Sequence, residues 1–433
     1  MRKKLEVWLI KEGESAFPIG TDQKKLMRTG ALAEYLSEQG HKVTWWTSDF
    51  VHAKKEYLFK EHKDVQINEN ERIVFLHSPV CYKRNVSVRR ILYHIIIAKQ
   101  FKRRICKEKK PDIIVCSYPT VQFAKAAVWY GKKYGVPVIL DTRDEWPDIF
   151  ERAVPKKLRP LMRLLLIPMK RETRRVYQKA TSLSAVVPAG LEWALNYAGR
   201  KRTRYDRVIY LGAKEKQIDY ENMQSHLSAW KQKGITENTW NICFFSTLSK
   251  TSLDLETVIK AVERLSKEIK ELRLIIGGAG DAFEELCQST ADIPAVVLPG
   301  WLEEEQMISL MSISKCGMLC YRNTPDFRDA FGNKATQYMS MGLPILTSTE
   351  GFAKSYLEKY NAGLAYKEGN VEDCINKISE MYKNPELLAT MSQNSKNRFY
   401  EDFDYRIVNK QFEETLYDVF HFCNKDVLSE RKE

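Results

Sequence analysis

Short β-branched and aromatic runs alternate with longer helical patterns along the whole chain, and this alternation limits the possible folds more than any other feature. Strands that alternate with helices form parallel sheets covered by helices on both faces. The first series of expected strands is 5–10, 42–48, 72–78, 112–118, 137–143 and 181–187. The second series is 207–212, 241–247, 272–278, 295–300, 316–321, 344–348 and 363–366.

Two such series predict an α/β protein with two Rossmann-like domains that face each other across a cleft. The chain has 433 residues, which is more than one core accommodates comfortably. We expect residues 1–205 and 206–400 to form the domains, and residues 401–433 to form a C-terminal helix that could return to the first. The polar stretch 213–238 is the best candidate for a linker, with a short helix at 221–230.

Net charge is divided unevenly between the two halves. Residues 1–205 carry 42 Lys and Arg against 21 Asp and Glu, whereas the remainder carries 27 against 35. This asymmetry indicates an anionic partner for the first half, with a merely solvated basic face as the alternative. We expect no nucleic acid as partner, because no recognised nucleic-acid module accompanies the charge.

Two stretches concentrate the positive charge. Residues 83–110 hold eleven Lys and Arg and one Glu, and residues 151–179 hold ten and two. Both combine helical spacing with bulky apolar residues, which is the pattern of a helix that lies on an anionic bilayer. The alternative is a helix with an apolar side toward the core and a basic side toward solvent.

The chain shows no run of eighteen uncharged apolar residues and no signal-peptide pattern. Nine Cys are scattered without a CxxC motif or a Cys/His cluster, so neither a zinc site nor a disulfide framework is indicated. We therefore expect a cytoplasmic protein, peripheral on the inner face of the cell membrane, with no bound metal or cofactor.

The segment DTRDEWPD, which follows the expected strand 137–143, is rich in charge. Packing alone does not explain this charge, because unpaired buried charge costs several kcal/mol. Asp144 is a candidate catalytic residue that accepts a proton from an acceptor hydroxyl. Arg143 could hold Asp141 or an anionic group, and Trp146 offers a flat face to a sugar ring or lipid. These last three are candidate acceptor-binding residues.

Turns after other strands add candidates for a phosphate or nucleotide site. Gly20 precedes an expected helix at 23–38, whose N-terminus is a usable anion site. Gly278 and Gly280 form a tight strand-to-helix turn, although Phe283 stands where a dinucleotide fingerprint requires glycine. Lys250 lies just beyond strand 241–247 and is placed to reach a phosphate.

The segment DAFGNKATQYM, residues 329–339, predicts a helix N-terminus suited to an anion. Asn333 is the expected N-cap, Gly332 lets a ligand approach the backbone, and Lys334 adds positive charge where the helix dipole already favours an anion. Asp329 just before the helix and Gln337 one turn into it are expected to face the same site.

Together these segments resemble a GT-B fold glycosyltransferase of the large retaining family four. The similarity is carried by RTGALAEYLSEQGHKVTWWTS, DTRDEWP, IIGGAGDAFEEL, LPGWLEEEQMISLMSISKCGMLCY and FGNKATQYMSMGLPILTS. The DTRDEWP and NKATQYM forms resemble the subgroup that builds bacterial surface polysaccharides such as O-antigen and capsule.

The resemblance implies sugar transfer from a nucleotide-sugar donor with retention at the anomeric carbon and without an essential metal. It implies a donor bound mainly by the second domain and an acceptor bound by the first. Two acids eight positions apart flank the donor in this family, and here those positions are Asp329 and Gln337.

A second departure concerns a Gly-Arg pair common in the family, which is Ser246-Thr247 here. The diphosphate charge then falls to Lys250, Lys334 and the helix N-terminus at Asn333. The expected catalytic set is Asp144, Lys250, Lys334 and Asp329, and the expected donor-binding set is Gly20, Gly278, Gly280, Gly332, Asn333 and Gln337.

We therefore expect an EC 2.4 glycosyltransferase whose acceptor is a cell-surface or lipid-pyrophosphate-linked glycan. Gln337 and Thr247 leave open a non-catalytic GT-B-like scaffold that binds a glycan or a membrane. A sugar-nucleotide 2-epimerase shares the fold, but it gives the basic amphipathic stretches no role.

Overall fold

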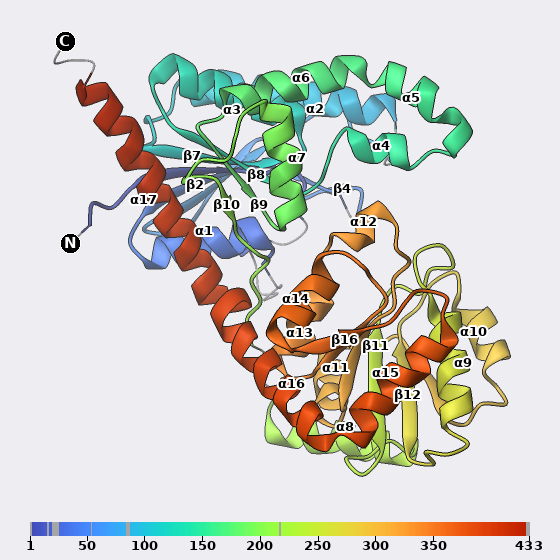
Figure 1. Cartoon of the computed structure of the whole chain (residues 1–433). Helices are drawn as coiled ribbons and strands as arrows, with labels where there is room; N and C mark the ends of the chain where they lie inside the picture. Colours follow the sequence, from blue (N-terminus) through green and yellow to red (C-terminus); the bar gives the residue numbers. More distant parts are fainter. Residues whose placement is uncertain are drawn as a thin grey trace. The chain divides into compact units, whose positions relative to one another are not determined.

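The computed structural model describes residues 2–14, 17–19, 26–52, 54–83, 87–215 and 218–429, with side chains up to residue 423. The chain forms two compact units (Figure 1). Unit 1 is Met1–Tyr210 with Val408–Glu433, and unit 2 is Leu211–Ile407.

Unit 1 is built on an eight-stranded sheet with the order β10-β9-β8-β7-β1-β2-β6-β5. All neighbours are parallel except β5 and β6. The strands are β1 (Glu6–Ile10), β2 (Lys42–Ser48), β5 (Lys63–Asn68), β6 (Glu71–Leu76), β7 (Ile113–Tyr118), β8 (Val138–Thr142), β9 (Ser182–Ala185) and β10 (Arg207–Val208). A separate hairpin pairs β3 (Phe50–Val51) with β4 (Glu56–Tyr57).

The helices of unit 1 flank this sheet. They are α1 (Arg28–Glu38), α2 (Val88–Ile105), α3 (Val121–Tyr134), α4 (Asp148–Arg152), η1 (Lys156–Leu158), α5 (Arg159–Leu165), α6 (Ile167–Lys179) and α7 (Pro188–Ala198). Helix α2 contacts α3, α3 contacts α6, and α6 contacts α7, so these four form one continuous layer.

The long helix α17 (Tyr405–Ser429) belongs to unit 1 from Val408 onward, and Figure 1 shows it beside α1. Its Glu413 accepts a hydrogen bond from the Tyr35 hydroxyl at 3.2 Å and lies 3.0 Å from the buried His41 ring. Its Tyr417 hydroxyl donates to the Lys3 carbonyl at 2.9 Å. The C-terminal helix is thus fixed to unit 1 by polar contacts to α1, to the turn after α1 and to the segment before β1.

Unit 2 is built on a six-stranded parallel sheet with the order β13-β12-β11-β14-β15-β16. The strands are β11 (Trp240–Phe245), β12 (Leu272–Gly277), β13 (Val296–Gly300), β14 (Cys316–Leu319), β15 (Ile345–Thr347) and β16 (Gly363–Ala365). The helices are α8 (Tyr220–Gln232), α9 (Leu255–Leu265), α10 (Phe283–Ser289), α11 (Glu304–Ser312), α12 (Pro325–Arg328), α13 (Asn333–Ser340), α14 (Phe352–Tyr360), α15 (Val371–Lys383), α16 (Pro385–Arg398) and η2 (Phe399–Phe403).

Burial on both faces explains why the strands read as apolar runs. Every residue of β7 and of β11 is buried, as expected for inner strands of parallel sheets. Each unit has its own apolar core. The α/β class with parallel sheets in two Rossmann-like halves, predicted from the sequence, is confirmed.

Three sequence expectations differ from the structure. The strand expected at 207–212 in the second domain is the short β10, which pairs with β9 in the sheet of unit 1. The expected linker 213–238 contains the anticipated helix, α8, but this helix is part of unit 2 because the buried Trp230 donates to Ser309 at 3.0 Å. The helix expected from residue 23 begins at Arg28; Leu26 and Met27 precede it, and residues 23–25 lie outside the described residues.

In the parts of the chain that the structure describes, no helix is both long and apolar enough to cross a membrane.

Candidate functional site

The strongest candidate in unit 2 is the N-terminus of α13, which follows β14 through the short helix α12. The N-cap is Gly332, in an extended conformation, and Asn333 is the first helical residue. The predicted capping role of Asn333 is therefore wrong, since its own backbone is already helical. A Cβ placed on Gly332 would meet nothing within 4 Å, so this backbone is open to a ligand.

Lys334 lies in the first turn of α13 and is only partly exposed. Burial lowers the pKa of its ammonium group, because the charged form loses part of its solvation. No carboxylate within the described ranges pairs with Lys334, and the N–H groups of Asn333 and Lys334 have no acceptor there. An unpaired ammonium beside free N–H groups at a helix N-terminus is the arrangement that an anion stabilises.

Asp329 and Gln337 lie on either side of this turn. Asp329 accepts a hydrogen bond from Arg328 at 2.9 Å, and its side chain is 33% exposed. Gln337 stands three residues after Lys334, so the two share one face of α13. Within the described chain no group bonds the Gln337 amide, which leaves it available.

The loop after β11 brings Lys250 to the same carboxyl edge of the sheet, where β11 lies between β12 and β14. Its ammonium group is not free, because it lies 2.6 Å from the Glu285 carboxylate. Both side chains are more than half exposed, and a surface ion pair of this kind is worth little. Lys250 can therefore exchange Glu285 for another anion at small cost.

Gly278 and Gly280 have a packing role. The loop after β12 is pressed against the loop after β11, with Leu248 donating to the Ala279 carbonyl at 2.9 Å. A Cβ on Gly278, whose φ is 141°, would lie 1.8 Å from the Ser246 carbonyl oxygen, and one on Gly280 would lie 2.2 Å from the Leu248 carbonyl oxygen. The tight turn predicted from the sequence is present, and its glycines are required by the backbone of residues 246–248.

Two residues at this edge were missed in the sequence. Asn323 follows β14 and joins two loops, because its amide donates to the Ser348 carbonyl and accepts from the Glu350 N–H, both at 2.7 Å. Trp301 follows β13 and is 64% exposed. A polar or aromatic residue in the loop after a strand was the available signal.

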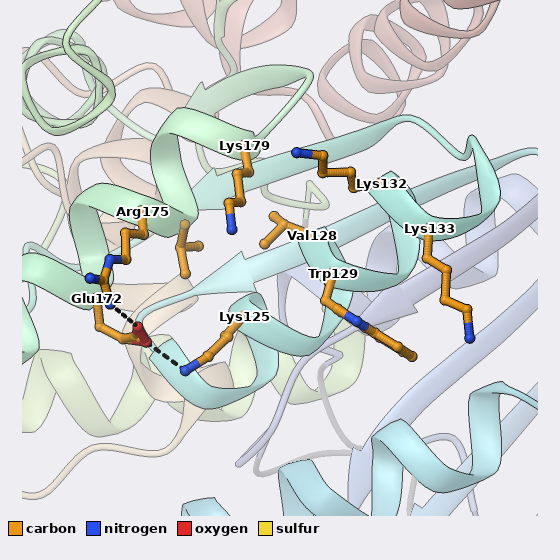
Figure 2. A pocket seen from close by; sticks show the side chains of 9 residues that line it. Lys125, Val128, Trp129, Lys132, Lys133, Glu172, Arg175 and Lys179 are labelled. Atoms are coloured by element: carbon orange, nitrogen blue, oxygen red, sulfur yellow. Dashed lines mark hydrogen bonds and ion pairs between the residues drawn. The ribbon is translucent and has the colours of Figure 1, made fainter.

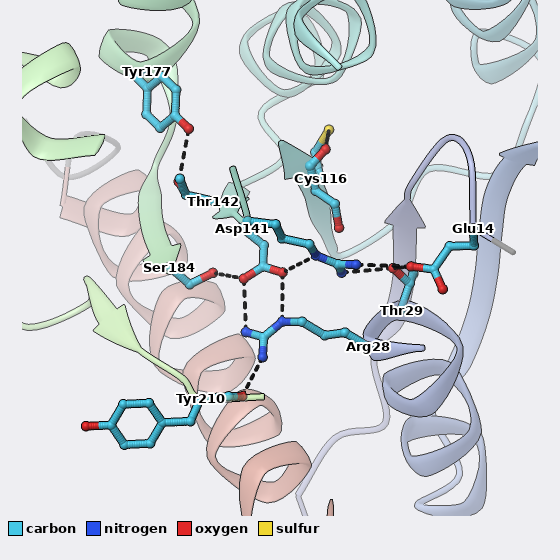
Figure 3. Close-up of polar contacts among 11 residues, drawn as sticks. Glu14, Arg28, Thr29, Cys116, Asp141, Thr142, Tyr177, Ser184 and Tyr210 are labelled. Atoms are coloured by element: carbon cyan, nitrogen blue, oxygen red, sulfur yellow. Dashed lines mark hydrogen bonds and ion pairs between the residues drawn. The ribbon is translucent and has the colours of Figure 1, made fainter. Parts of the chain in front are cut away.

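In unit 1, charged residues in and just after β8 join a network with the loop after β1 and the start of α1 (Figure 3). Arg28 donates to both carboxylate oxygens of Asp141, at 2.9 and 3.0 Å. Arg143 donates to Asp141 at 3.0 Å, to Glu14 at 3.0 Å and to Thr29 at 2.9 Å. Ser184 supplies a further donor to Asp141 at 2.9 Å.

Asp141 is fully buried in this network and has no exposed oxygen to offer an acceptor. Burial opposes its ionisation, but the charges of Arg28 and Arg143 outweigh that effect and hold the pKa below its ordinary value. The geometry thus contradicts direct acceptor contact by Asp141. Of the two roles considered for Arg143, the structure shows the one that holds Asp141.

Asp144 and Trp146 differ from their neighbours in the same segment. Asp144 is exposed, and no described residue pairs with its carboxylate. Trp146 is partly buried, with the Arg90 guanidinium 4.8 Å from its ring centroid and Phe150 against it at 4.6 Å. The open flat face predicted for Trp146 is therefore partly covered.

Beside this segment lie residues of the β1 loop that the sequence did not single out. Glu12 is buried, with its carboxylate 3.5 Å from the ring of the buried His94. The pKa of the adjacent Lys11 is lowered mainly by burial and, to a smaller extent, by the positive charge of Arg143. Several charged residues directly after β1 were a signal in the sequence that was missed. The same kind of signal identified the charged segment at the end of β8. Gly20 lies outside the described residues.

Two family descriptions match this chain on these two units. Residues 27–210 match the glycosyl transferase 4-like domain, and residues 228–398 match the glycosyl transferases group 1 domain. Together the two matches span most of the chain, and each describes a glycosyl transferase domain. The GT4-like domain coincides with most of unit 1 and the group 1 domain with most of unit 2.

Individual relatives of these domains are distant. N-acetyl-alpha-D-glucosaminyl L-malate synthase of Bacillus anthracis is 20% identical over 192 residues, 44% of this chain and 48% of that protein, so the match spans about half of the relative. Sucrose-phosphate synthase from Thermosynechococcus elongatus superimposes with a TM-score of 0.68 at 15% identity, over 96% of this chain and 99% of that one.

Anabaena HepE in complex with UDP superimposes with a TM-score of 0.64 at 15% identity, over 95% of this chain and 100% of that one. The same protein is known in complex with UDP-glucose. These structural similarities establish the fold.

Proposed function

We propose that this protein is a retaining glycosyltransferase that moves a sugar from a nucleotide-sugar donor to a glycan acceptor. The observation that carries the proposal is Lys334, a partly buried and unpaired ammonium at the open N-terminus of α13. The two matched domains and the UDP-glucose complex of HepE support it. The expectation that no metal is needed stays a prediction.

In the proposed donor site, the group 1 domain meets the charge of the leaving diphosphate. Lys334 and the N–H groups of Asn333 and Lys334 supply fixed positive potential, which stabilises charge that develops in the transition state. Lys250 adds a second ammonium once it leaves Glu285. Gly332 permits close approach, because no atom lies near its missing Cβ.

Asp329 and Gln337 are proposed to bind the donor's hydroxyl groups. An ionised Asp329 accepts hydrogen bonds, and the Gln337 amide oxygen accepts one as well, although without charge. Hydrogen bonds to a charged acceptor are roughly twice as strong as neutral ones. With Gln337 in place of an acid, the donor is therefore bound more weakly, but the hydrogen bond to its hydroxyl group is kept.

The acceptor is proposed to bind at the carboxyl edge of the sheet in unit 1. Asp144 is the candidate that orients or deprotonates the acceptor hydroxyl, because its carboxylate is exposed and is not paired with any described residue. The leaving diphosphate itself is the alternative base. The network of Arg28, Asp141 and Arg143 fixes the strand end from which Asp144 projects.

A lipid-pyrophosphate-linked or cell-surface glycan is the proposed acceptor, reached on the inner face of the membrane. Two groups of exposed apolar side chains in unit 1 support this. The first, on η1 and α5, comprises four leucines that are 52 to 64% exposed: Leu158, Leu161, Leu164 and Leu165. The second, on the first turns of α2, comprises Val88, Ile91, Leu92 and Ile95, each at least 45% exposed. Clustered exposed apolar side chains mark interaction sites, whereas single ones do not.

The charge on the helices that carry these two groups favours an anionic bilayer over a protein partner. Helix α2 carries six Lys and Arg and no acid, and η1 with α5 carries four and no acid. Apolar side chains that enter the interface, ringed by cations that meet acidic headgroups, are the combination that holds a helix on such a membrane. Helix α2 also buries Tyr93, Ile97 and Phe101. The helix therefore has both an apolar side in the core and an exposed apolar side.

A mass-spectrometric screen of nucleotide sugars tests the proposed activity. We expect one donor to be retained and slowly hydrolysed, and its sugar to reach the acceptor with unchanged anomeric configuration by NMR. Full turnover in both Asp144→Asn and Lys334→Gln would contradict the assigned sites. No binding of any nucleotide sugar would favour a scaffold, and release of a free epimerised sugar would identify an epimerase.

Co-sedimentation with vesicles tests the membrane proposal. We expect binding to vesicles of phosphatidylglycerol and phosphatidylcholine at low salt, and loss of binding at high salt. Leu164→Ser/Leu165→Ser should weaken it about tenfold, because each lost leucine removes apolar area from the interface. Leu58→Ser, in a loop of unit 1 where Leu58 is 44% exposed, is the control. Equal, negligible binding to anionic and pure phosphatidylcholine vesicles would contradict the proposal.

A further inference from the structure

A cavity of about 320 Å³ lies between α3 and α6 in unit 1, and no residue assigned above to donor or acceptor lines it. Figure 2 shows its lining. It is lined by five basic side chains and one acidic side chain: Lys125, Lys132, Lys133, Arg175, Lys179 and Glu172. Val128, Val176 and Trp129 complete the lining.

The single acid neutralises only one part of this cavity. Glu172 lies 2.7 Å from the Lys125 ammonium and 3.4 Å from the Arg175 guanidinium (Figure 2). Lys132 and Lys179 have no carboxylate partner in the described part of the chain. Two ammonium groups thus share one end of a concave surface without a counter-charge.

The floor of the cavity is apolar and firmly packed. Val128 and Val176 are buried, each on its own helix. Trp129 is held by cations, with the Lys102 ammonium 3.9 Å and the Lys133 ammonium 5.2 Å from its ring centroid. An anionic group above this floor would lie within reach of the ammonium groups that line the rim.

The helix dipole explains the positions of some of these cations but not of all. Lys132, Lys133 and Lys179 lie in the last turns of their helices, where the dipole favours positive charge. Lys125 and Arg175 lie in the helix bodies. Like charges that gather in a concave site raise the local potential, and a bound anion relieves it.

We propose that the α3–α6 cavity binds the phosphate group of an organic phosphate. Lys132 and Lys179 would bind its oxygens, and Arg175 would join them by leaving Glu172. The volume matches the lower range of small-ligand sites. Lys132 and Lys179 also line an adjoining cavity of about 600 Å³, which gives room for the rest of the molecule. The proposal is independent of the transferase chemistry, since it uses none of its residues.

The test is a titration of the indole N–H resonance of Trp129, assigned with Trp129→Phe, by glycerol 3-phosphate at low salt. We expect saturable shifts in the full chain, and at least tenfold weaker binding in Arg175→Gln/Lys179→Gln. Arg171→Gln/Arg174→Gln is the matched control, because it removes the same charge from exposed positions on α6 outside the cavity. It should bind like the wild type.

Equal weakening in both double variants would overturn the proposal, because it would show an unspecific basic surface; so would an unmoved Trp129 resonance. Dihexanoyl phosphatidic acid distinguishes the sources of the phosphate. Binding more than tenfold tighter than glycerol 3-phosphate assigns the cavity to a lipid headgroup, and equal binding assigns it to a free organic phosphate. The Trp129 resonance reports on α3 in unit 1 and the titration uses no nucleotide, so failure here is separable from failure of the proposed function.

Discussion

Arg28 and Asp141 form a bidentate ion pair in unit 1, with donor–acceptor distances of 2.9 and 3.0 Å. Their side chains are only 7% and 1% exposed. Arg143 donates to the same carboxylate at 3.0 Å. Asp141→Asn would leave both guanidinium groups without their shared counter-charge. We expect a loss of about 3 to 5 kcal/mol in the free energy of unfolding, measured by urea denaturation.

Asp144→Asn is the matched control for stability. The same substitution three residues later removes an exposed carboxylate that no described residue pairs with. We expect a change within about 0.5 kcal/mol. Similar losses for the two variants would show that the buried network does not stabilise unit 1 as the distances indicate.

Gly278→Ala tests the packing of the loops after β11 and β12. Its Cβ would lie 1.8 Å from the Ser246 carbonyl oxygen, at a φ of 141° that side chains rarely adopt. Backbone displacement and strain together should cost about 3 kcal/mol of unfolding free energy. Differential scanning calorimetry of the variant should show a lowered transition for unit 2, and an unchanged transition would refute the contact.

Gly332→Ala is the same chemical change at an open position. Its φ is −73° and no atom lies within 4 Å of the added Cβ, so stability should be nearly unchanged. The new methyl group would stand where the diphosphate is proposed to approach the backbone. We expect nucleoside diphosphate affinity, measured by calorimetry, to fall about tenfold; wild-type affinity would remove Gly332 from the donor site.

Glu71 at the start of β6 predicts a pH dependence of stability. Burial raises the pKa of its carboxyl from the ordinary 4.5 to about 7, opposed by a 3.4 Å hydrogen bond from Ser37. Between those values the folded state holds a proton that the unfolded state has released, so stability falls as pH rises from 4.5 to 7. Glu71→Gln removes this titration.

The variant should therefore be about 2 to 4 kcal/mol more stable than the wild type at pH 8, and similar to it near pH 4. Urea denaturation at the two pH values measures the difference. The low-pH comparison is the internal control, since Glu71 is then protonated in both states. An equal gap at both pH values would contradict the raised pKa.

Lys334 should couple donor binding to proton uptake. Burial lowers the pKa of its ammonium, and a bound diphosphate favours the charged form. Affinity should therefore fall as pH rises between the lowered pKa and the ordinary 10.5, with protons taken up on binding. Calorimetry in two buffers of different ionisation enthalpy measures the uptake, and uptake that persists in Lys334→Gln would assign it to another group.

The sequence predicted the inner strands of both sheets well, because residues buried on both faces form continuous apolar runs such as those of β7 and β11. It missed β5, an edge strand of sequence KDVQIN with no buried residue, since a solvated strand leaves little apolar signal. It misplaced β10, whose two residues join the sheet of unit 1 through β9. Pairing between distant strands is not visible in a local pattern.

The candidate site shows the same limit. Charge after β8 marked an important segment, but the separate fates of Asp141 and Asp144 depend on Arg28, more than a hundred residues away. Asp141 lies within β8, whose five residues are all buried, whereas Asp144 lies beyond the end of the strand. The N-cap is Gly332 rather than the predicted Asn333, because a sequence fixes the start of a helix only to within one or two residues.

The most direct test of the central claim is calorimetric titration of the full chain with UDP, GDP, ADP and dTDP. At least one should bind, and Lys334→Gln should weaken it about 10- to 100-fold, the value of a charge-assisted contact. Lys383→Gln, at the exposed end of α15, removes the same charge elsewhere in unit 2 and should bind like the wild type. No binding of any of the four, or equal binding by Lys334→Gln and the wild type, would contradict the α13 donor site.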